Sequence, residues 1–303
     1  MTVHALRFDA SSVPIETDED PTALHLALAE FGRIRLAPAL PTPSWRDDVV
    51  AETSLRLIEG AFVERERTAV QPLLANLPTR ARDFVPWYES LRDTGPGQGD
   101  PLFPWLAERA DLQAMRWFVE QEAAGEAGFD DLVALTQVKL PTAAKLELAR
   151  NYWDEMGRGD RRGMHGPMLE ALVRALTLSP QPHKTVWQSL ALGNLMTALA
   201  ANRRYAFHSV GALGAIEMTA PDRAKAVAKG LTRLGLDKAS CHYFNLHAVL
   251  DRKHSADWNR EAIATLIEAD PALVRPVAEG ALMRLAAGAR CFERYRKEFN
   301  QGA

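Results

Sequence analysis

Two histidines and an aspartate in this chain have a spacing that suits metal binding. His247, Asp251 and His254 stand at positions i, i+4 and i+7. An α-helix turns by about 100° per residue, so the three side chains fall within an arc of about 60°. Two imidazoles and a carboxylate on one helical face form a donor set suited to iron, manganese or zinc. A solvated polar face is the alternative interpretation of this spacing.

Three further donors lie upstream of that helix. Glu217 follows the apolar run 210–216, where a carboxylate needs a partner to be tolerated. Glu155 is predicted in the last turn of a helix that ends at Gly157, and an acid there opposes the helix dipole unless a cation is present. His165 begins the next predicted helix. Taken singly, Glu155 also fits an exposed acid, and His165 also fits a cap or a packed imidazole.

Together these six donors match two metal ions that share a bridging carboxylate better than they match one. The predicted ligands are Glu155, His165, Glu217, His247, Asp251 and His254. Asp154 and Asp160 are nearby oxygen donors of lower weight. Asp154 turns about 100° away from Glu155 on the helix, and Asp160 lies in the predicted loop.

The elements that must position these donors are all predicted to be helices. No segment shows the alternation of a strand, and no repeat of fixed period is present. Proline and glycine stops delimit the helices. The segment 93–101 is the densest Gly/Pro cluster, so we predict an N-terminal helical extension over 1–104 and a metal-binding bundle over 105–303. The expected helices are 21–31, 44–77, 110–136, 141–156, 165–178, 183–202, 204–218, 221–234, 238–254, 258–268 and 271–298, after an irregular lead-in over 1 to about 20.

The order of the donors resembles a known family. A Glu, about ten residues, a His, then a Glu, and about thirty residues later His-x3-Asp-x2-His are similar to the haem-oxygenase-like diiron oxidases and oxygenases, which bind iron without haem. Their superfamily includes haem oxygenase, the TenA proteins and pyrroloquinoline quinone synthase. The resemblance covers roughly residues 105–300. It implies an all-α, haem-oxygenase-like multi-helical bundle that holds two non-haem iron ions and uses dioxygen as co-substrate.

Carried over residue by residue, the resemblance assigns roles to the donors. Glu155 and His165 resemble ligands of one iron, Glu217 resembles the bridging carboxylate, and the three donors of the last motif resemble ligands of the other iron.

The resemblance also points to residues around the ions. Gln121-Glu122 stands where TenA proteins carry a pocket-lining Gln-Asp pair, so Glu122, and Glu126 one turn later, are predicted as acids of the cavity. Tyr152 precedes Glu155 by three positions and is predicted near the site. An exposed acidic stripe and a core tyrosine are the ordinary alternatives. Gly125 and Gly128 are expected to serve close helix packing or to leave space for substrate, and Gly211 and Gly214 are expected to open room beside the metals.

Composition excludes several classes of partner. The net charge of −3 and the pI near 6.3 provide no basic field for nucleic acid or anionic membranes. The sequence shows no apolar leader and no run of some 18 apolar residues. We therefore predict a cytoplasmic protein that has no membrane partner. Cys241 and Cys291 lack a CxxC pattern and are expected to be reduced thiols.

The sequence therefore predicts a non-haem dinuclear-iron oxidase or oxygenase that activates dioxygen to oxidise a small organic substrate. A homodimer and an external electron donor are further predicted partners. One alternative is a cofactor-independent enzyme of the TenA or quinone-synthase type, in which the polar cluster binds substrate directly. Another is a non-catalytic metal-binding bundle.

Overall fold

The computed structural model describes residues 20–125 and 128–300, and in these ranges the chain is helical and contains no strand. The predicted all-α class is confirmed. Glu126 and residues 1–19 of the predicted lead-in lie outside the described residues. The α-helices are α1 (Pro21–Leu36), α2 (Trp45–Val70), α3 (Ala81–Thr94), α4 (Leu102–Glu108), α5 (Leu112–Gly125), α6 (Phe129–Thr136), α7 (Thr142–Glu155), α8 (His165–Ala175), α9 (Trp187–Ala201), α10 (Ala206–Arg233), α11 (His242–Asp257), α12 (Thr265–Ala269) and α13 (Val274–Glu298).

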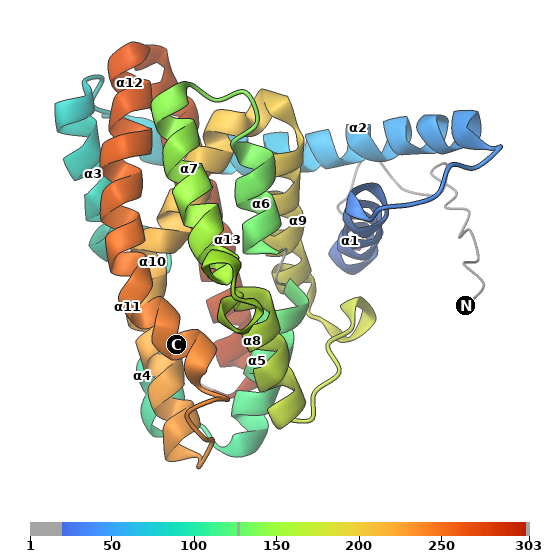
Figure 1. Ribbon diagram of the computed structural model, residues 1–303, viewed down its shortest axis with the longest axis vertical. Coiled ribbons are helices and arrows are strands. Elements are labelled where there is room, and N and C mark those ends of the chain that lie inside the picture. The colour runs from blue at the N-terminus through green and yellow to red at the C-terminus, as the bar shows by residue number, and fades with distance from the viewer. Residues whose placement is uncertain (1–19, 126–127, 301–303) are drawn as a thin grey trace.

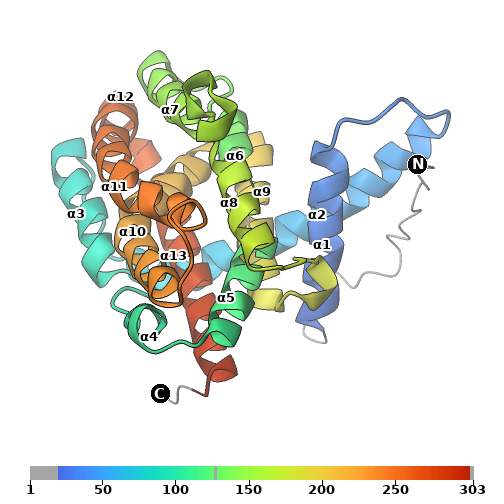
Figure 2. The same ribbon diagram turned by 60° about the horizontal axis from the view of Figure 1, so that its bottom comes forward.

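The helices form a bundle with α10 and α13 packed against each other in its interior (Figure 1). The helices α7 and α11 lie on one side of this pair, and α9 lies on another. The helix α2 crosses the bundle and projects beyond it, where α1 packs beside α2 and α9 (Figure 2). The carbonyl of Gly211 on α10 accepts a hydrogen bond from the Tyr88 hydroxyl of α3 at 2.6 Å. The N-terminal helices therefore contact the bundle directly, and the division near residue 104 stays a prediction.

Local signals set the start of the first helix correctly but missed two helices, α3 and α4. Asp20 caps α1 by accepting hydrogen bonds from the backbone of Thr22 and Ala23, and Pro21 occupies the first turn, as predicted. The helix α3 was not predicted. Its buried Phe84 and Tyr88 are four residues apart on one face, but its internal proline and the adjoining glycine-rich loop conceal this periodicity.

Two predicted helix boundaries are wrong. The expected stop at Pro221 is absent, because α10 continues through it from Ala206 to Arg233. Pro221 has no N–H to donate to the carbonyl of Glu217, but extensive packing against α4, α11 and α13 holds the helix on both sides of this defect. The expected break after His254 is instead a π-helical segment, Trp258–Ala264, which joins α11 to α12.

Two other boundaries also differ from the prediction. The single helix expected over 110–136 is two helices, α5 and α6. Gly128, at a φ of +72°, precedes the first residue of α6. The helix α2 ends at Val70 and is followed by a 3-10 turn over Gln71–Leu74, short of the expected end near residue 77.

The glycines of α10 serve packing between helices. A Cβ at Gly211 would lie 2.0 Å from the carbonyl oxygen of Val277 on α13, so these backbones approach too closely for any other residue. A Cβ at Gly214 would lie 2.8 Å from the Trp258 indole and from the Tyr88 hydroxyl. The idea that these two glycines open space beside the metals is therefore wrong.

The outer part of the N-terminal helices carries exposed apolar side chains. At least half of the side-chain surface is exposed at four apolar residues of α2, namely Trp45, Val49, Val50 and Leu57. None of the described helices is both long enough and apolar enough to cross a membrane.

Candidate metal centre

A closed loop brings two of the predicted ligands together. Glu155 is the last residue of α7, and His165 is the first residue of α8. The loop between them is closed at its base by a β-bridge between Met156 and Met164. As a result, the Nδ1 atom of His165 lies 2.6 Å from Oε2 of Glu155, without hydrogen-bond geometry.

Two glycines allow this closure. Gly157 has a φ of +60°, a conformation that other residues rarely adopt. A Cβ at Gly157 would also lie 2.3 Å from the backbone of Gly163, on the returning side of the loop. The close approach of these two backbones is what places Glu155 and His165 side by side.

The remaining predicted ligands lie on α10 and α11, which pack along each other. Glu217 is buried in the middle of α10. Asp251 and His254 are also buried, and His247 is partly buried. The face of α11 that carries the motif therefore points into the protein, which excludes a solvated polar face.

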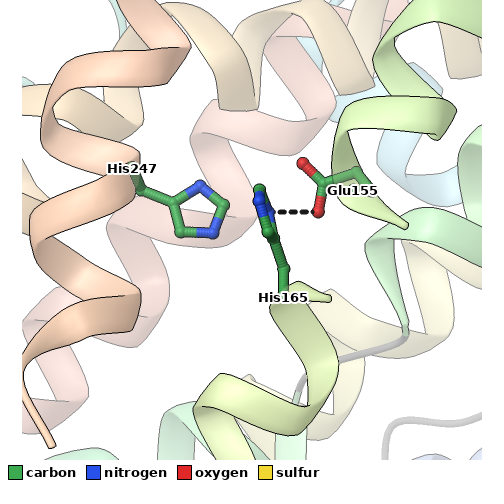
Figure 3. Close-up of side chains that lie close together, drawn as sticks. All are labelled: Glu155, His165 and His247. Carbon is green, nitrogen blue, oxygen red and sulfur yellow. Dashed lines mark ion pairs between the residues drawn. The ribbon is translucent and has the colours of Figure 1, made fainter. Parts of the chain in front are cut away.

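The donors converge as two overlapping groups whose atoms lie within 4.8 Å of one another. The first group is Glu155, His165 and His247, from three different helices (Figure 3). The second is Glu155, Glu217 and His254. His247 and His254 are separated by about 10 Å along α11, so they reach different groups. This partition differs from the predicted one, because Glu155 rather than Glu217 belongs to both groups.

Five atoms in these groups have no hydrogen-bond partner in the described parts of the chain although they are buried. They are Glu155 Oε1, His165 Nδ1, Glu217 Oε2, His247 Nε2 and His254 Nδ1, and we call them the open ligand atoms. Glu217 Oε2 and His254 Nδ1 face each other at 3.5 Å without hydrogen-bond geometry. Buried polar atoms are rarely left unpaired. Oxygen and imidazole nitrogen atoms left open in this way fit a bound metal such as iron.

The other atoms of these ligands are held by neighbouring side chains. Nδ1 of His247 is 3.1 Å from Asp251 Oδ1, and Nε2 of His254 is 3.0 Å from Asp154 Oδ2. A proton on each of these nitrogens would leave the opposite ring nitrogen free to bind a metal, the arrangement common around metal-binding histidines. Asp251 therefore lies beside the first group and contacts one of its members, and its role as a ligand stays a prediction.

Two supporting residues were missed or underweighted by the sequence reasoning. Asn151 donates from Nδ2 to Glu217 Oε1 at 2.5 Å. It stands four residues before Glu155, so helical spacing alone could have placed it on the ligand face. Asp154 was given low weight as a donor because it turns away from Glu155, and that same turn directs it to His254.

The excess of carboxylates raises the proton affinity of the histidines. Burial by itself would lower the pKa of His247, but Asp251, Glu155 and Glu217 outweigh it and raise the pKa to about 9. The pKa of His254 is likewise raised to about 9 against the effect of burial, chiefly by Glu217. Burial and Glu217 raise the pKa of Asp251 to about 6. Protons on the histidines thus neutralise the carboxylates, and a cation would take over that function.

The two residues predicted as catalytic lie in different surroundings. Tyr152 packs against the apolar core and is not among the residues that line the cavity beside the ligands. Glu122 lines that cavity and accepts a hydrogen bond from the Tyr295 hydroxyl at 2.8 Å, but it belongs to neither ligand group. Asp160 is exposed in the loop and accepts a hydrogen bond from the backbone of Arg162.

A cavity of about 230 Å³ adjoins the ligands. Glu155, His165, Glu217, His247 and Asp251 form one part of its wall. Apolar side chains form much of the rest, among them Phe118, Leu169, Leu192, Met196, Ile216 and Phe292. A mostly apolar pocket next to convergent polar groups is typical of a small-molecule site.

Comparison with known proteins agrees with this geometry. The sequence profile of the family described as "Iron-containing redox enzyme" matches residues 116–289, more than half of the chain. The chain belongs to this family. The matched region contains all six predicted ligands, so membership and the convergence of donors concern the same part of the molecule. No curated protein matches the sequence.

A solved structure supports the fold. A domain of unknown function with a haem oxygenase-like fold, from Shewanella denitrificans OS217, is similar with a TM-score of 0.50. The similarity covers 71% of this chain and 90% of that domain, at 15% sequence identity. At this identity the similarity shows the fold alone. The predicted haem-oxygenase-like helical bundle and the predicted family are therefore confirmed for this iron-containing redox enzyme. Both cysteines are free, as predicted.

Proposed function

We propose that this protein is a non-haem dinuclear-iron oxidase or oxygenase that uses dioxygen to oxidise a small organic substrate. The observation that carries the proposal is the pair of ligand groups that share Glu155 and contain five buried atoms without a hydrogen-bond partner in the described chain. Bundles that hold two iron ions with carboxylate and histidine ligands on facing helices follow the same plan.

The two groups suggest how the ligands divide between the ions. His165 and His247 would hold one ion, and Glu217 and His254 would hold the other. Glu155 has one oxygen beside His165 and the other oxygen open, so it can bridge the two. Asp251 contacts Nδ1 of His247, the ring nitrogen opposite the open one, so in this arrangement it would orient His247, and its role as a ligand stays a prediction.

Around the ions, residues of the chain would orient the ligands, exclude water and hold the substrate. When bound, ferrous ions supply electrons to dioxygen, which provides the oxidising power of the reaction. Asp154 and Asp251 orient the imidazoles through the hydrogen bonds to His254 and His247. The apolar cavity wall keeps water away from the reacting bond and holds the substrate beside Glu217 and His165.

Counting ions in ligand variants tests the proposal. Anaerobically purified protein, titrated with ferrous iron, is expected to bind two ions per chain. Because Glu155 belongs to both groups, Glu155→Ala should weaken both sites, whereas His247→Ala and His254→Ala should each weaken one. His208→Ala is the control, since His208 is a buried histidine that contacts Glu279 instead. Wild-type protein that bound no iron, or variants that kept two ions, would contradict the proposal.

Measuring oxygen consumption then distinguishes an enzyme from a non-catalytic metal-binding bundle. The proposal expects the ferrous protein to consume oxygen, with faster consumption when substrate is present. A non-catalytic metal-binding bundle would bind iron without faster oxygen consumption in the presence of substrate. A cofactor-independent enzyme would keep its activity after the metal is removed by a chelator. An external electron donor and a homodimer are proposed partners, and cytoplasmic localisation is likewise a proposal.

A further inference from the structure

A second pocket reaches the candidate metal centre from a different side. It lies between α7, the end of α11 and the π-helical segment, and we call it the polar pocket because charged and polar side chains line it. His254 lines the polar pocket, whereas Glu155, His165, Glu217 and His247 line the mostly apolar cavity. The candidate metal centre therefore lies between an apolar space and a polar one.

The charges of the polar pocket are arranged with carboxylates inside and cations at the rim. Its carboxylate side chains are between 4% and 38% exposed, and they belong to Glu147, Asp154, Asp257 and Glu261. Its cationic side chains are all more than half exposed, and they belong to Arg150, Lys253 and Arg260. Ion pairs with such exposed, flexible side chains contribute little to stability. The carboxylates can therefore exchange these partners for a metal ion.

The base of the polar pocket contacts the second ligand group. Asp154 Oδ2 is 3.0 Å from His254 Nε2, and Asn151 Nδ2 donates to Glu217 Oε1. Asp154 and Asn151 both line the polar pocket. A cation bound between these two residues is therefore one side chain away from the open ligand atoms of His254 and Glu217.

An unpaired atom of Asn151 provides independent evidence for a ligand in the polar pocket. Asn151 is 1% exposed, and its Oδ1 atom has no hydrogen-bond partner among residues 20–125 and 128–300. An amide oxygen can only accept, and buried acceptors are rarely left unpaired. Amide oxygens are common ligands of hard divalent cations, so a passing cation would satisfy this atom.

The mostly apolar cavity is a less suitable route for a metal ion. Phe118, Leu192 and Ile216 are among the residues that line it. A hydrated divalent cation loses favourable interactions with water against such a wall and gains no replacement. In the polar pocket, carboxylate oxygens can replace the water ligands one after another.

We propose that the polar pocket is the entry site for ferrous iron. The hydrated ion first binds Asp257 and Glu261, the two most exposed carboxylates of the pocket, and then passes to Asp154 and Asn151. From there it reaches the open ligand atoms of the second group. This inference rests on the proposed function only in that the centre binds iron.

The rate of iron uptake tests the proposal separately from the number of ions bound. Metal-free protein is mixed anaerobically with ferrous iron, and a coloured ferrous chelator added after set times measures the iron that is still unbound. Asp257→Asn combined with Glu261→Gln should slow uptake at least about tenfold at low ionic strength, because carboxylates at an entrance raise the local concentration of cations. The number of ions bound at equilibrium should stay the same, since neither side chain belongs to a ligand group.

Asp130→Asn combined with Asp131→Asn is the matched control. It removes the same charge from the first turn of α6, where Asp130 lines the mostly apolar cavity. Uptake by this control should equal that of the wild type. Normal uptake by the Asp257/Glu261 variant would overturn the proposal. Equal slowing of both variants, or slowing of the control alone, would also overturn it.

Lys253→Gln should have the opposite effect on uptake. Lys253 lines the polar pocket and pairs with Asp257, so its removal frees a carboxylate at the entrance and should speed uptake at low ionic strength. Lys229→Gln is the control, since Lys229 is an exposed lysine that pairs with Glu108 elsewhere. Equal uptake rates of the two lysine variants would contradict the proposal.

The same measurements separate this inference from the proposed function. Normal iron stoichiometry with an unchanged uptake rate in the Asp257/Glu261 variant refutes the entry site alone. Iron uptake through the polar pocket without oxygen consumption refutes the oxidase or oxygenase alone. Wild-type protein that binds no iron refutes both.

Discussion

Two buried clusters in this protein combine carboxylates with histidine, and the chain completes only one of them. Glu279 on α13 is 1% exposed, like the metal-centre carboxylates. Its Oε2 accepts hydrogen bonds from His208 and Arg67, and its Oε1 accepts from Gln71 and Arg275. By contrast, one oxygen of Glu155 and one of Glu217 are open among the described residues.

The difference shows why residue type alone does not identify a ligand. At Glu279 the protein supplies its own cations, and the cluster fastens α2 and the turn after it to α10 and α13. At Glu155 and Glu217 no lysine or arginine of the described chain approaches the open oxygens, and the histidines carry the compensating charge. A buried carboxylate with arginine partners is structural, whereas one that depends on protonated histidines is ready to exchange those protons for a metal.

The largest expected effect is a difference between Glu217, which is proposed to bind iron, and Glu279, which stabilises the fold. Glu217→Gln replaces an open oxygen ligand by an amide of equal size, so affinity for one of the two ferrous ions should fall more than about 100-fold. Glu279→Gln should leave two ions bound but lower the free energy of unfolding by about 3 kcal/mol, because an amide cannot satisfy all its donors. Anaerobic iron titration and urea denaturation measure the two effects.

The opposite pattern would remove the distinction between the clusters. If Glu279→Gln lost iron, or if Glu217→Gln unfolded the metal-free protein, the two carboxylates would share one structural role.

The stabilisation provided by ionised Glu279 should be lost in a defined range of acidic pH. Burial by itself would raise the pKa of Glu279, but hydrogen bonds from His208, Gln71 and Arg67 outweigh it and lower the pKa to about 2. The folded-state pKa is below the unfolded one, so this stabilisation is complete above about pH 4.5 and is lost as the pH falls towards 2. The amount lost is about 3 kcal/mol. Urea denaturation of metal-free wild type and Glu279→Gln at pH 6 and pH 3 should show their difference shrinking, and a constant difference would refute this.

A smaller effect is expected from the residues that orient the histidines. Asp154→Asn removes the charged acceptor for His254 Nε2, so iron affinity should fall about 10- to 100-fold with two ions still bound at saturation. Asp160→Asn is the matched control in the neighbouring loop, where Asp160 contacts only the Arg162 region. Competition with a ferrous chelator measures both affinities. Equal affinities of the two variants would show that Asp154 does not position the ligand.

The smallest effect tests the loop that joins the two ligands of the first group. Gly157→Ala introduces a Cβ at positive φ and against the Gly163 backbone, so the loop must shift and iron affinity at the first group should fall about tenfold. Gly99→Ala carries a similar φ of +67° with no heavy atom within 4 Å of the new Cβ. It should lower the free energy of unfolding by about 1 kcal/mol without changing iron affinity. Thermal unfolding and iron titration distinguish the two variants.

The sequence could supply the candidate donors because their positions follow local helical geometry. His247, Asp251 and His254 share a face in any α-helix, and Glu217 is conspicuous within an apolar run. Helical spacing does not decide nonlocal contacts. The packing of α7 directs Asn151 and Asp154 towards the candidate ligands, whereas Tyr152 packs against the core, the alternative left open for it, and its predicted place near the site stays a prediction.

By itself, the sequence determined the all-α class and the family and supplied a set of candidate metal donors, since a period of 3.6 residues and the types of side chain are local properties. The tertiary structure decided which donors meet. The closure of the loop after α7 joins Glu155 to His165, and the two turns of α11 between His247 and His254 divide the ligands into two groups around Glu155. It also decided that the polar pocket reaches His254, because only the packing of α7 against the π-helical segment brings the charged side chains of these elements together.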